Sequence, residues 1–383
     1  MSKPKSRLDW LSASRGYAMY GVFLGHLLIT FPPDGPFVFE LLTLGQYLNP
    51  LVVPFFIILA GAFYSQTKTS FKDYTKFRFS QRIFPVWLYL LLIIPFFFLW
   101  PLPDKTGIDS LRLMPLYLLG IPAVSWSSWF LVALFSAEIL YYFILPLASN
   151  TRRSLLLAAV LYSIAWLSGW FSYQSDLYRF IAMIGMLQAS VLFCAFFLLG
   201  KCVRPFILKL SHWENKQTLL YLCLSIALLL LFTRWNTPHL LTPSDHSFFQ
   251  FVRNDLIDLS FGQYGHYVWG LACMLSGASA LLFFSRLIPA SNLMRRCGDS
   301  CFVLIGLNGI FLNNLNVHIS AWLASHIEQA WLMIACYLVI ALMSLLICLP
   351  LAEKLEQYLP QLTGKPMLKG PILGALYSKK TVP

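Results

Sequence analysis

Long hydrophobic runs dominate the chain and predict its architecture. About ten of them are 17–25 residues long, which is the length that a helix needs to cross a bilayer. They lie at 10–31, 46–65, 83–101, 127–147, 154–171, 181–200, 217–233, 264–285, 299–317 and 330–350. A shorter run at 111–124 contains Pro115, Gly120 and Pro122, and we interpret it as an interfacial or re-entrant piece. The pattern therefore predicts an all-α, polytopic membrane bundle of about ten transmembrane helices.

The placement of basic residues tests this number, because cytoplasmic loops of membrane proteins carry an excess of Lys and Arg. With a cytoplasmic N-terminus and ten spans, the cytoplasmic segments hold 22 of the 28 basic residues, and the external segments hold five. Adding or removing one span would invert part of this pattern. We therefore expect both termini in the cytoplasm, a membrane domain over residues 1–360, and a cytoplasmic tail over 361–383 that is disordered or lies on the surface.

Composition agrees with a membrane protein. The chain is 58% hydrophobic and only 11% charged, whereas soluble domains carry about 25% charged residues. The net charge of +12 follows the membrane topology, and we find no nucleic-acid-binding motif, so we expect no nucleic-acid partner. The eight cysteines form no CxxC pair and no Cys/His cluster with zinc spacing, so no metal site is predicted. The first apolar run lacks a cleavage site and is interpreted as an uncleaved span.

The first span carries two ionisable residues in the segment RGYAMYGVFLGH, namely Arg15 and His26. Such groups are costly inside an apolar span and indicate function by default. Eleven residues at about 100° each place both side chains on one helix face, about 16 Å apart along the axis. Arg15 alone could be a residue reaching out from the helix mouth, and His26 alone could be an interface histidine with a hydrogen-bond partner. Their shared face favours a functional pair lining one cavity.

Three further charged residues are candidates. Arg78 and Arg82, in KTSFKDYTKFRFSQRIFP, lie one helical turn apart and could bind a phosphate or pyrophosphate bidentately. The same basic cluster could instead set topology and contact lipid head groups. Glu138 is the lone carboxylate deep in its span and needs a partner, for which Arg15 is the obvious candidate. Both a structural ion pair and a functional role are compatible with Glu138.

Gly61, in the second span, has no side chain and therefore predicts a close approach of two helices.

Several segments resemble the acyltransferase 3 family of integral membrane enzymes. The first is the Arg, ten residues and His of the first span, which follow a Leu-Asp pair. FRFSQRIFP resembles an Arg-rich family segment, with three residues instead of two between Arg78 and Arg82. PFFIILAGAFYS resembles the FF…SGF segment, with Ala60 at the Ser position, and SSWFLVALFSAEILYY resembles HLWFL, with Ser128 at the His position. DSCFVLIGLNGIF resembles S…YLLH, with Asn308 where the His stands.

The resemblance implies an O-acyltransferase of the inner (plasma) membrane. The implied donor is acetyl-CoA or another acyl-CoA from the cytoplasm, and the acceptor is a hydroxyl of an envelope glycan or glycolipid. His26 is expected to act as the general base, since its ordinary pKa suits proton transfer near neutral pH. Arg15 is expected to hold the donor phosphate or pantetheine path, and Arg82 with Arg78 the nucleotide end. We expect a polar tunnel lined by Arg15 and His26, with the external loop 234–263 over its outer mouth.

Three residues are candidates for contacting the substrate: Trp129, Glu138 and Asn308. Trp129 is equally consistent with a stacking contact and with the aromatic belt at the membrane interface. An alternative function is a transporter or flippase for a glycolipid or exopolysaccharide, which ten spans and a basic inner face suit equally well. Transporters typically show inverted repeats with matching broken helices, and none is evident in the sequence.

Overall fold

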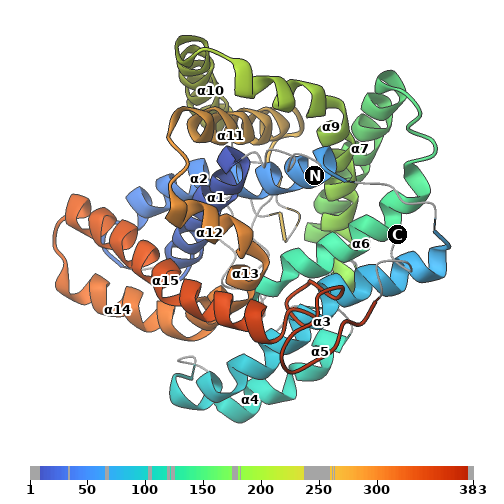
Figure 1. Cartoon of the computed structure of the whole chain (residues 1–383). Coiled ribbons are helices and arrows are strands. Elements are labelled where there is room, and N and C mark those ends of the chain that lie inside the picture. The colour runs from blue at the N-terminus through green and yellow to red at the C-terminus, as the bar shows by residue number, and fades with distance from the viewer. Residues whose placement is uncertain are drawn as a thin grey trace.

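The computed structural model describes residues 9–32, 35–64, 69–101, 106–118, 121, 126–174, 180–181, 183–236, 259–260, 262 and 264–377. Within these ranges the regular structure is helical and contains no strand. Seven helices are long and apolar enough to cross a membrane. The prediction of an all-α, multi-pass membrane bundle is therefore confirmed (Figure 1).

Helical segments occupy all ten predicted spans. Seven of these spans coincide with the helices that are long and apolar enough to cross: α2 (Val38–Ala62), α3 (Phe71–Leu99), α7 (Thr151–Gln174), α9 (Leu187–Lys209), α10 (Asn215–Trp235), α11 (Tyr267–Leu287) and α15 (Ala330–Tyr358). The other three hold α1 (Asp9–Leu28), α6 (Trp129–Ile144) and the run from α13 (Cys301–Ile310) through a π-helical turn (Phe311–Leu315) into α14 (Asn316–His326). The apolar run 111–124 contains only the end of α4 (Gly107–Arg112) and the short α5 (Met114–Leu118) in its described part.

Successive spans run in alternate directions, and polar contacts join their neighbouring ends. Arg286, at the end of α11, donates to the carbonyls of Leu210, Ser211 and Trp213 between α9 and α10. Near the end of α7, the indole of Trp166 donates to the carbonyl of Gly265, which precedes α11. The bundle therefore has two ends, which we name the Arg15 end and the His26 end after the two halves of α1.

Helix α1 lies in the middle of the bundle and packs against α2, α11, α13, α15 and the short α12 (Asn292–Asp299), while α10 and α7 lie further out against α11 and α9 (Figure 1). Glycines allow the closest of these approaches. A Cβ on Gly61 of α2 would lie 2.4 Å from the Cα of Phe197 on α9, and one on Gly200 would lie 2.2 Å from the carbonyl oxygen of Ile58. The close approach predicted at Gly61 is confirmed. Gly298 meets the backbone of Ser12 in the same way and brings α12 onto α1.

Residues 359–377 form a folded segment beside α3. Gln361 is fully buried, and its amide nitrogen donates to the carbonyls of Leu368 and Leu373. The ring of Tyr377 meets that of Phe77 on α3 edge to face, with centroids 5.5 Å apart. The described part of the predicted tail is therefore ordered by its own hydrogen bonds and by packing, and does not fit the expectation of disorder.

Candidate active site

Helix α1 presents Arg15 and His26 on the same side, toward the consecutive helices α12 and α13. The Nη2 atom of Arg15 lies 3.6 Å from Oδ1 of Asp299, the last residue of α12. Nδ1 of His26 lies 2.9 Å from Nδ2 of Asn308 on α13. The two side chains thus share one helix side, as their spacing predicts, at opposite ends of α1.

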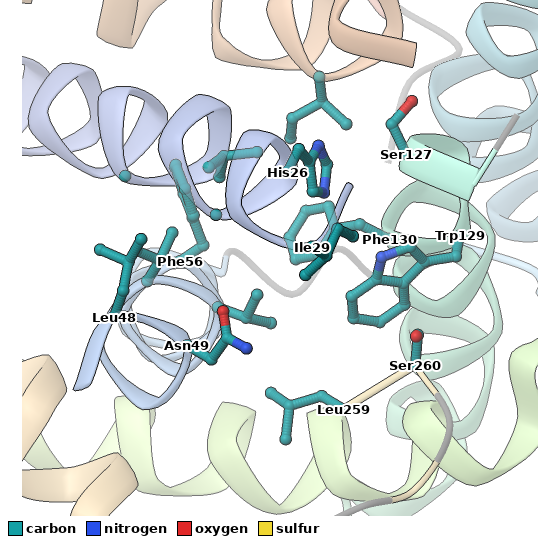
Figure 2. Close-up of a pocket in the computed structure, with 16 residues that line it drawn as sticks. His26, Ile29, Leu48, Asn49, Phe56, Ser127, Trp129, Phe130, Leu259 and Ser260 are labelled. Carbon is teal, nitrogen blue, oxygen red and sulfur yellow. The ribbon is translucent and has the colours of Figure 1, made fainter. Parts of the chain in front are cut away.

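His26 lines a cavity of about 100 Å³ near the His26 end of the bundle. Figure 2 shows that the indole of Trp129 and the amide of Asn49 face the open space beside this histidine. Ser127 and Ser260 supply the remaining polar side chains of the described lining, and the other lining residues are apolar. The cavity therefore combines one imidazole, one amide, two hydroxyls and an aromatic wall.

Trp129 reaches the cavity because it is the first residue of α6, directly after the 3-10 turn Trp126–Ser128. It is 7% exposed, and its ring contacts those of Phe130 and Phe193. Ser128, which directly precedes Trp129, is fully buried. The interior position of Trp129 does not fit the aromatic-belt alternative, and a stacking contact with substrate stays a prediction.

Asn308 is fully buried, and its amide is directed at the His26 ring. It comes from α13, which approaches α3 closely because Gly306 leaves room for the ring of Tyr89. A Cβ on Gly306 would lie 2.0 Å from the Cδ2 atom of that ring. The structure thus assigns Asn308 a contact with the candidate base, while its predicted contact with substrate stays a prediction.

Glu138 is paired with the two arginines of α3, so the expectation that Arg15 is its partner is wrong. Arg82 binds the carboxylate with two hydrogen bonds, from Nη2 to Oε1 at 2.8 Å and from Nε to Oε2 at 3.1 Å. Nη1 of Arg78 lies 3.4 Å from the same Oε1. Arg15 is paired with Asp299 instead, because α12 lies along α1.

Both α3 arginines are held inside the protein. The side chains of Arg78 and Arg82 are only 14% and 11% exposed. The guanidinium of Arg78 lies 5.3 Å and 5.2 Å from the ring centres of Tyr64 and Tyr74, and Arg82 lies 4.7 Å from that of Phe302. Two cations and one carboxylate leave one positive charge in this cluster, which is the charge that an anionic ligand could use.

Arg15 lies outside the cavity around His26. The described lining on α1 begins at Gly21, and Met19, one turn from Arg15, is fully buried in the apolar core. The continuous tunnel expected between Arg15 and His26 is therefore not formed by this cavity. Two residues of the predicted external loop, Leu259 and Ser260, do line it. Most of that loop lies outside the described residues.

A family model described as an acyltransferase domain matches residues 8–353, which is nearly the whole chain. The chain belongs to the acyltransferase 3 family. No curated protein and no solved structure gives a match. Membership supports a membrane acyltransferase acting on carbohydrates in general, and implies an acyl donor and a hydroxyl-bearing acceptor.

The site of this acyltransferase 3 protein contains polar residues that the sequence reasoning did not single out. Asn49 is an amide inside the predicted span 46–65, and Asp299 is a carboxylate at the first position of the span 299–317. Polar groups within apolar spans are rare and often mark functional sites. The sequence could therefore have identified Asn49 and Asp299 as candidates. Ser260 gave no such signal, because it lies in a long polar loop.

The titratable side chain in the described lining of this acyltransferase 3 site is the His26 imidazole, and Cys297 lies outside that lining. Burial raises the pKa of the Cys297 thiol to about 11, which keeps it protonated near neutral pH. Among the described residues, no group of three or more His, Cys, Asp or Glu side chains could hold a metal ion. His26 has one ring nitrogen on Asn308, which leaves Nε2 for a ligand in the cavity.

Proposed function

We propose that the protein transfers an acetyl group from acetyl-CoA to a hydroxyl of an envelope glycan or glycolipid in the inner membrane. The observation that carries this proposal is the placement of His26 in a cavity with Trp129, at the opposite end of α1 from Arg15. We place the Arg15 end in the cytoplasm, because the basic segments lie there under the predicted topology. Donor and acceptor then approach the same histidine from opposite sides of the membrane.

His26 acts as the general base in this proposal. Its Nε2 takes the proton of the acceptor hydroxyl while the hydroxyl oxygen attacks the thioester carbonyl. The new C–O bond forms, the C–S bond breaks, and the imidazolium returns the proton to the thiolate of coenzyme A. Trp129 supports the sugar ring of the acceptor, and the amide of Asn49 lies across the cavity, where it can donate to a substrate oxygen.

The donor nucleotide binds at the Arg15 end. Arg15 is about one-third exposed, and it can move from Asp299 to a phosphate, because an exposed ion pair contributes little stability. Arg78 and Arg82 supply one net positive charge within the protein. An extended pantetheine arm has to cover the axial separation of about 16 Å between Arg15 and His26. Because the His26 cavity does not reach Arg15, donor binding has to open a path along α1 past Met19.

The test uses purified protein in liposomes with radiolabelled acetyl-CoA and an extract of envelope lipids. We expect label on a lipid or glycan product and an equal release of coenzyme A. His26→Ala should lower the transfer rate by about 10²–10⁴-fold, the usual contribution of a general base. His318→Ala is the matched control, since His318 lies outside this cavity and contacts the carbonyl of Pro101. Parental rates in His26→Ala would refute the assignment, and movement of unmodified glycolipid without coenzyme A release would identify a transporter.

A further inference from the structure

The half-buried His26 ring and the fully buried Asn308 amide form a hydrogen-bonded pair, and the positions of their atoms alone do not fix which group is the donor. In the orientation recorded, Nδ2 of Asn308 faces Nδ1 of His26 at 2.9 Å. The amide oxygen of Asn308 is buried and has no hydrogen-bond partner among the described residues. Rotating the amide by 180° exchanges its oxygen and nitrogen, which are similar in size, so packing alone does not distinguish the two orientations. The rotated form gives the oxygen a partner in the His26 ring and places the NH2 group where the oxygen has none.

The two orientations give His26 opposite chemistry. When Nδ2 donates to Nδ1, the proton of the neutral imidazole sits on Nε2, which can then donate a proton but cannot accept one. When the amide oxygen faces the ring, Nδ1 carries the proton and donates it to that oxygen. Nε2 then presents a lone pair to the cavity, and only this form of the ring is a base toward a substrate hydroxyl.

We propose that Asn308 is the positioning residue of His26, and that its amide oxygen accepts the Nδ1 proton and thereby holds Nε2 as the base. This inference rests on the proposed function, in which Nε2 removes a proton from the acceptor. The same orientation serves both halves of the reaction. Once Nε2 has gained the proton, the imidazolium carries N–H on both nitrogens, and Nδ1 still needs an acceptor.

The fold holds Asn308 in place from both sides. Two residues before it, Gly306 packs against the ring of Tyr89. Six residues after it, the amide nitrogen of Asn314 donates to the carbonyls of Phe96 and Trp100 at the end of α3. Asn314 lies in the π-helical turn Phe311–Leu315, and such turns are frequent at functional sites. The amide group of Asn308 can rotate about its Cβ–Cγ bond. These contacts hold the helix on either side of Asn308 and so set the distance between its amide and the His26 ring.

An amide suits this position because it orients the ring without adding charge. Charged and titratable side chains on the helices packed against α1 lie toward its Arg15 end or at helix ends. They are Arg286 on α11, Arg295, Arg296 and Asp299 on α12, Glu353, Lys354 and Glu356 on α15, Glu40 on α2, and His318 and His326 on α14. The side-chain atom within hydrogen-bond distance of the His26 ring is Nδ2 of Asn308. A carboxylate at position 308 would favour the imidazolium and would withdraw the base at neutral pH.

The tautomer can be measured without any catalytic assay. Protein labelled with ¹⁵N-histidine, in nanodiscs at pH 8, is examined by long-range ¹H–¹⁵N correlation, and the His26 signals are assigned by their loss in His26→Gln. We expect the proton on Nδ1 in the parent and a shift toward Nε2–H in Asn308→Leu. A parent ring with its proton on Nε2 would overturn the inference. Because this readout needs no substrate, it separates the inference from the proposed function, which is tested by His26→Ala.

Two variants at position 308 then distinguish an acceptor from a donor or a substrate contact. Asn308→Asp keeps an acceptor and has no amide donor. It should therefore lose transfer at neutral pH but retain it at higher pH, where the imidazolium has lost its proton, with the acid limb of its pH–rate profile moved up by about one unit or more. Asn308→Leu should lower kcat by about 10²-fold with little change in the KM for the acceptor. Loss of activity in Asn308→Asp at every pH, or a change confined to the acceptor KM in Asn308→Leu, would overturn the proposal. Asn316→Asp, at another buried asparagine, controls for a carboxylate that only destabilises the fold.

Discussion

The ion cluster of Glu138, Arg78 and Arg82 gives the sharpest prediction for stability. Replacing Glu138 by Gln keeps the shape of the side chain but removes the carboxylate that two largely buried guanidinium groups share. The carboxylate is 4% exposed, with Arg82 at 2.8 Å and Arg78 at 3.4 Å. The variant therefore leaves two neighbouring cations inside the protein with no compensating charge.

The magnitude follows from these distances. Unit charges at 2.8–3.4 Å attract each other by about 5–6 kcal/mol at an effective dielectric constant of about 20, and much of that offsets the cost of removing the ions from water. Breaking a buried pair by removing one partner costs about 3–5 kcal/mol in measured cases. At about 2 °C per kcal/mol for a large domain, we expect the melting temperature to fall by about 6–10 °C.

The assay is thermal unfolding of the purified protein in detergent, followed by tryptophan fluorescence. Glu353→Gln is the matched control, because Glu353 makes a bidentate pair with Arg296, at 2.6 Å and 2.7 Å, whose side chains are 36% and 46% exposed. Exposed pairs contribute about 0–1 kcal/mol, so this control should melt within about 2 °C of the parent. Adding Arg82→Gln to Glu138→Gln should recover part of the loss, since it removes one unpaired cation.

Equal melting temperatures for Glu138→Gln and Glu353→Gln would refute this reasoning. It would mean that water or lipid head groups reach Arg78 and Arg82 and replace the carboxylate. Further destabilisation by Arg82→Gln in the double variant would also contradict the argument, because the guanidinium would then be stabilised by contacts other than Glu138.

Three further predictions follow from the site and from the packing. Trp129→Ala should raise the KM for the acceptor more than it lowers kcat, measured with labelled acetyl-CoA, and an unchanged KM would exclude a substrate contact. Gly61→Leu should lower the free energy of unfolding by about 1–3 kcal/mol or more, because the new Cβ would meet the α9 backbone. Gly374→Leu should leave the free energy of unfolding unchanged, because no atom lies close to a Cβ at that position. Arg15→Ala should raise the KM for acetyl-CoA relative to Arg112→Ala, whose side chain is 77% exposed, and equal values would remove Arg15 from the donor site.

The sequence by itself determined the helical bundle. A chain in a bilayer must satisfy its backbone hydrogen bonds within each apolar segment, so long apolar runs become helices whatever their neighbours are. Helix geometry is equally local, which is why the spacing of Arg15 and His26 was enough to place them on one side of α1. The close approach at Gly61 could also be predicted from the sequence. A glycine within a span has no side chain and so indicates that another helix comes close, although it does not say which helix.

Only the tertiary structure decided which residues meet. Glu138 pairs with Arg82, which is 56 positions away, instead of Arg15, because α3 packs on α6 while α12 lies along α1. His26 meets Asn308 across 282 positions, and Asn49 enters the cavity from a third helix. Hydrophobic periodicity identifies the buried side of a helix but not the helix opposite it. The partner of each polar group depends on the packing of distant segments, and that packing sets the chemistry of the site.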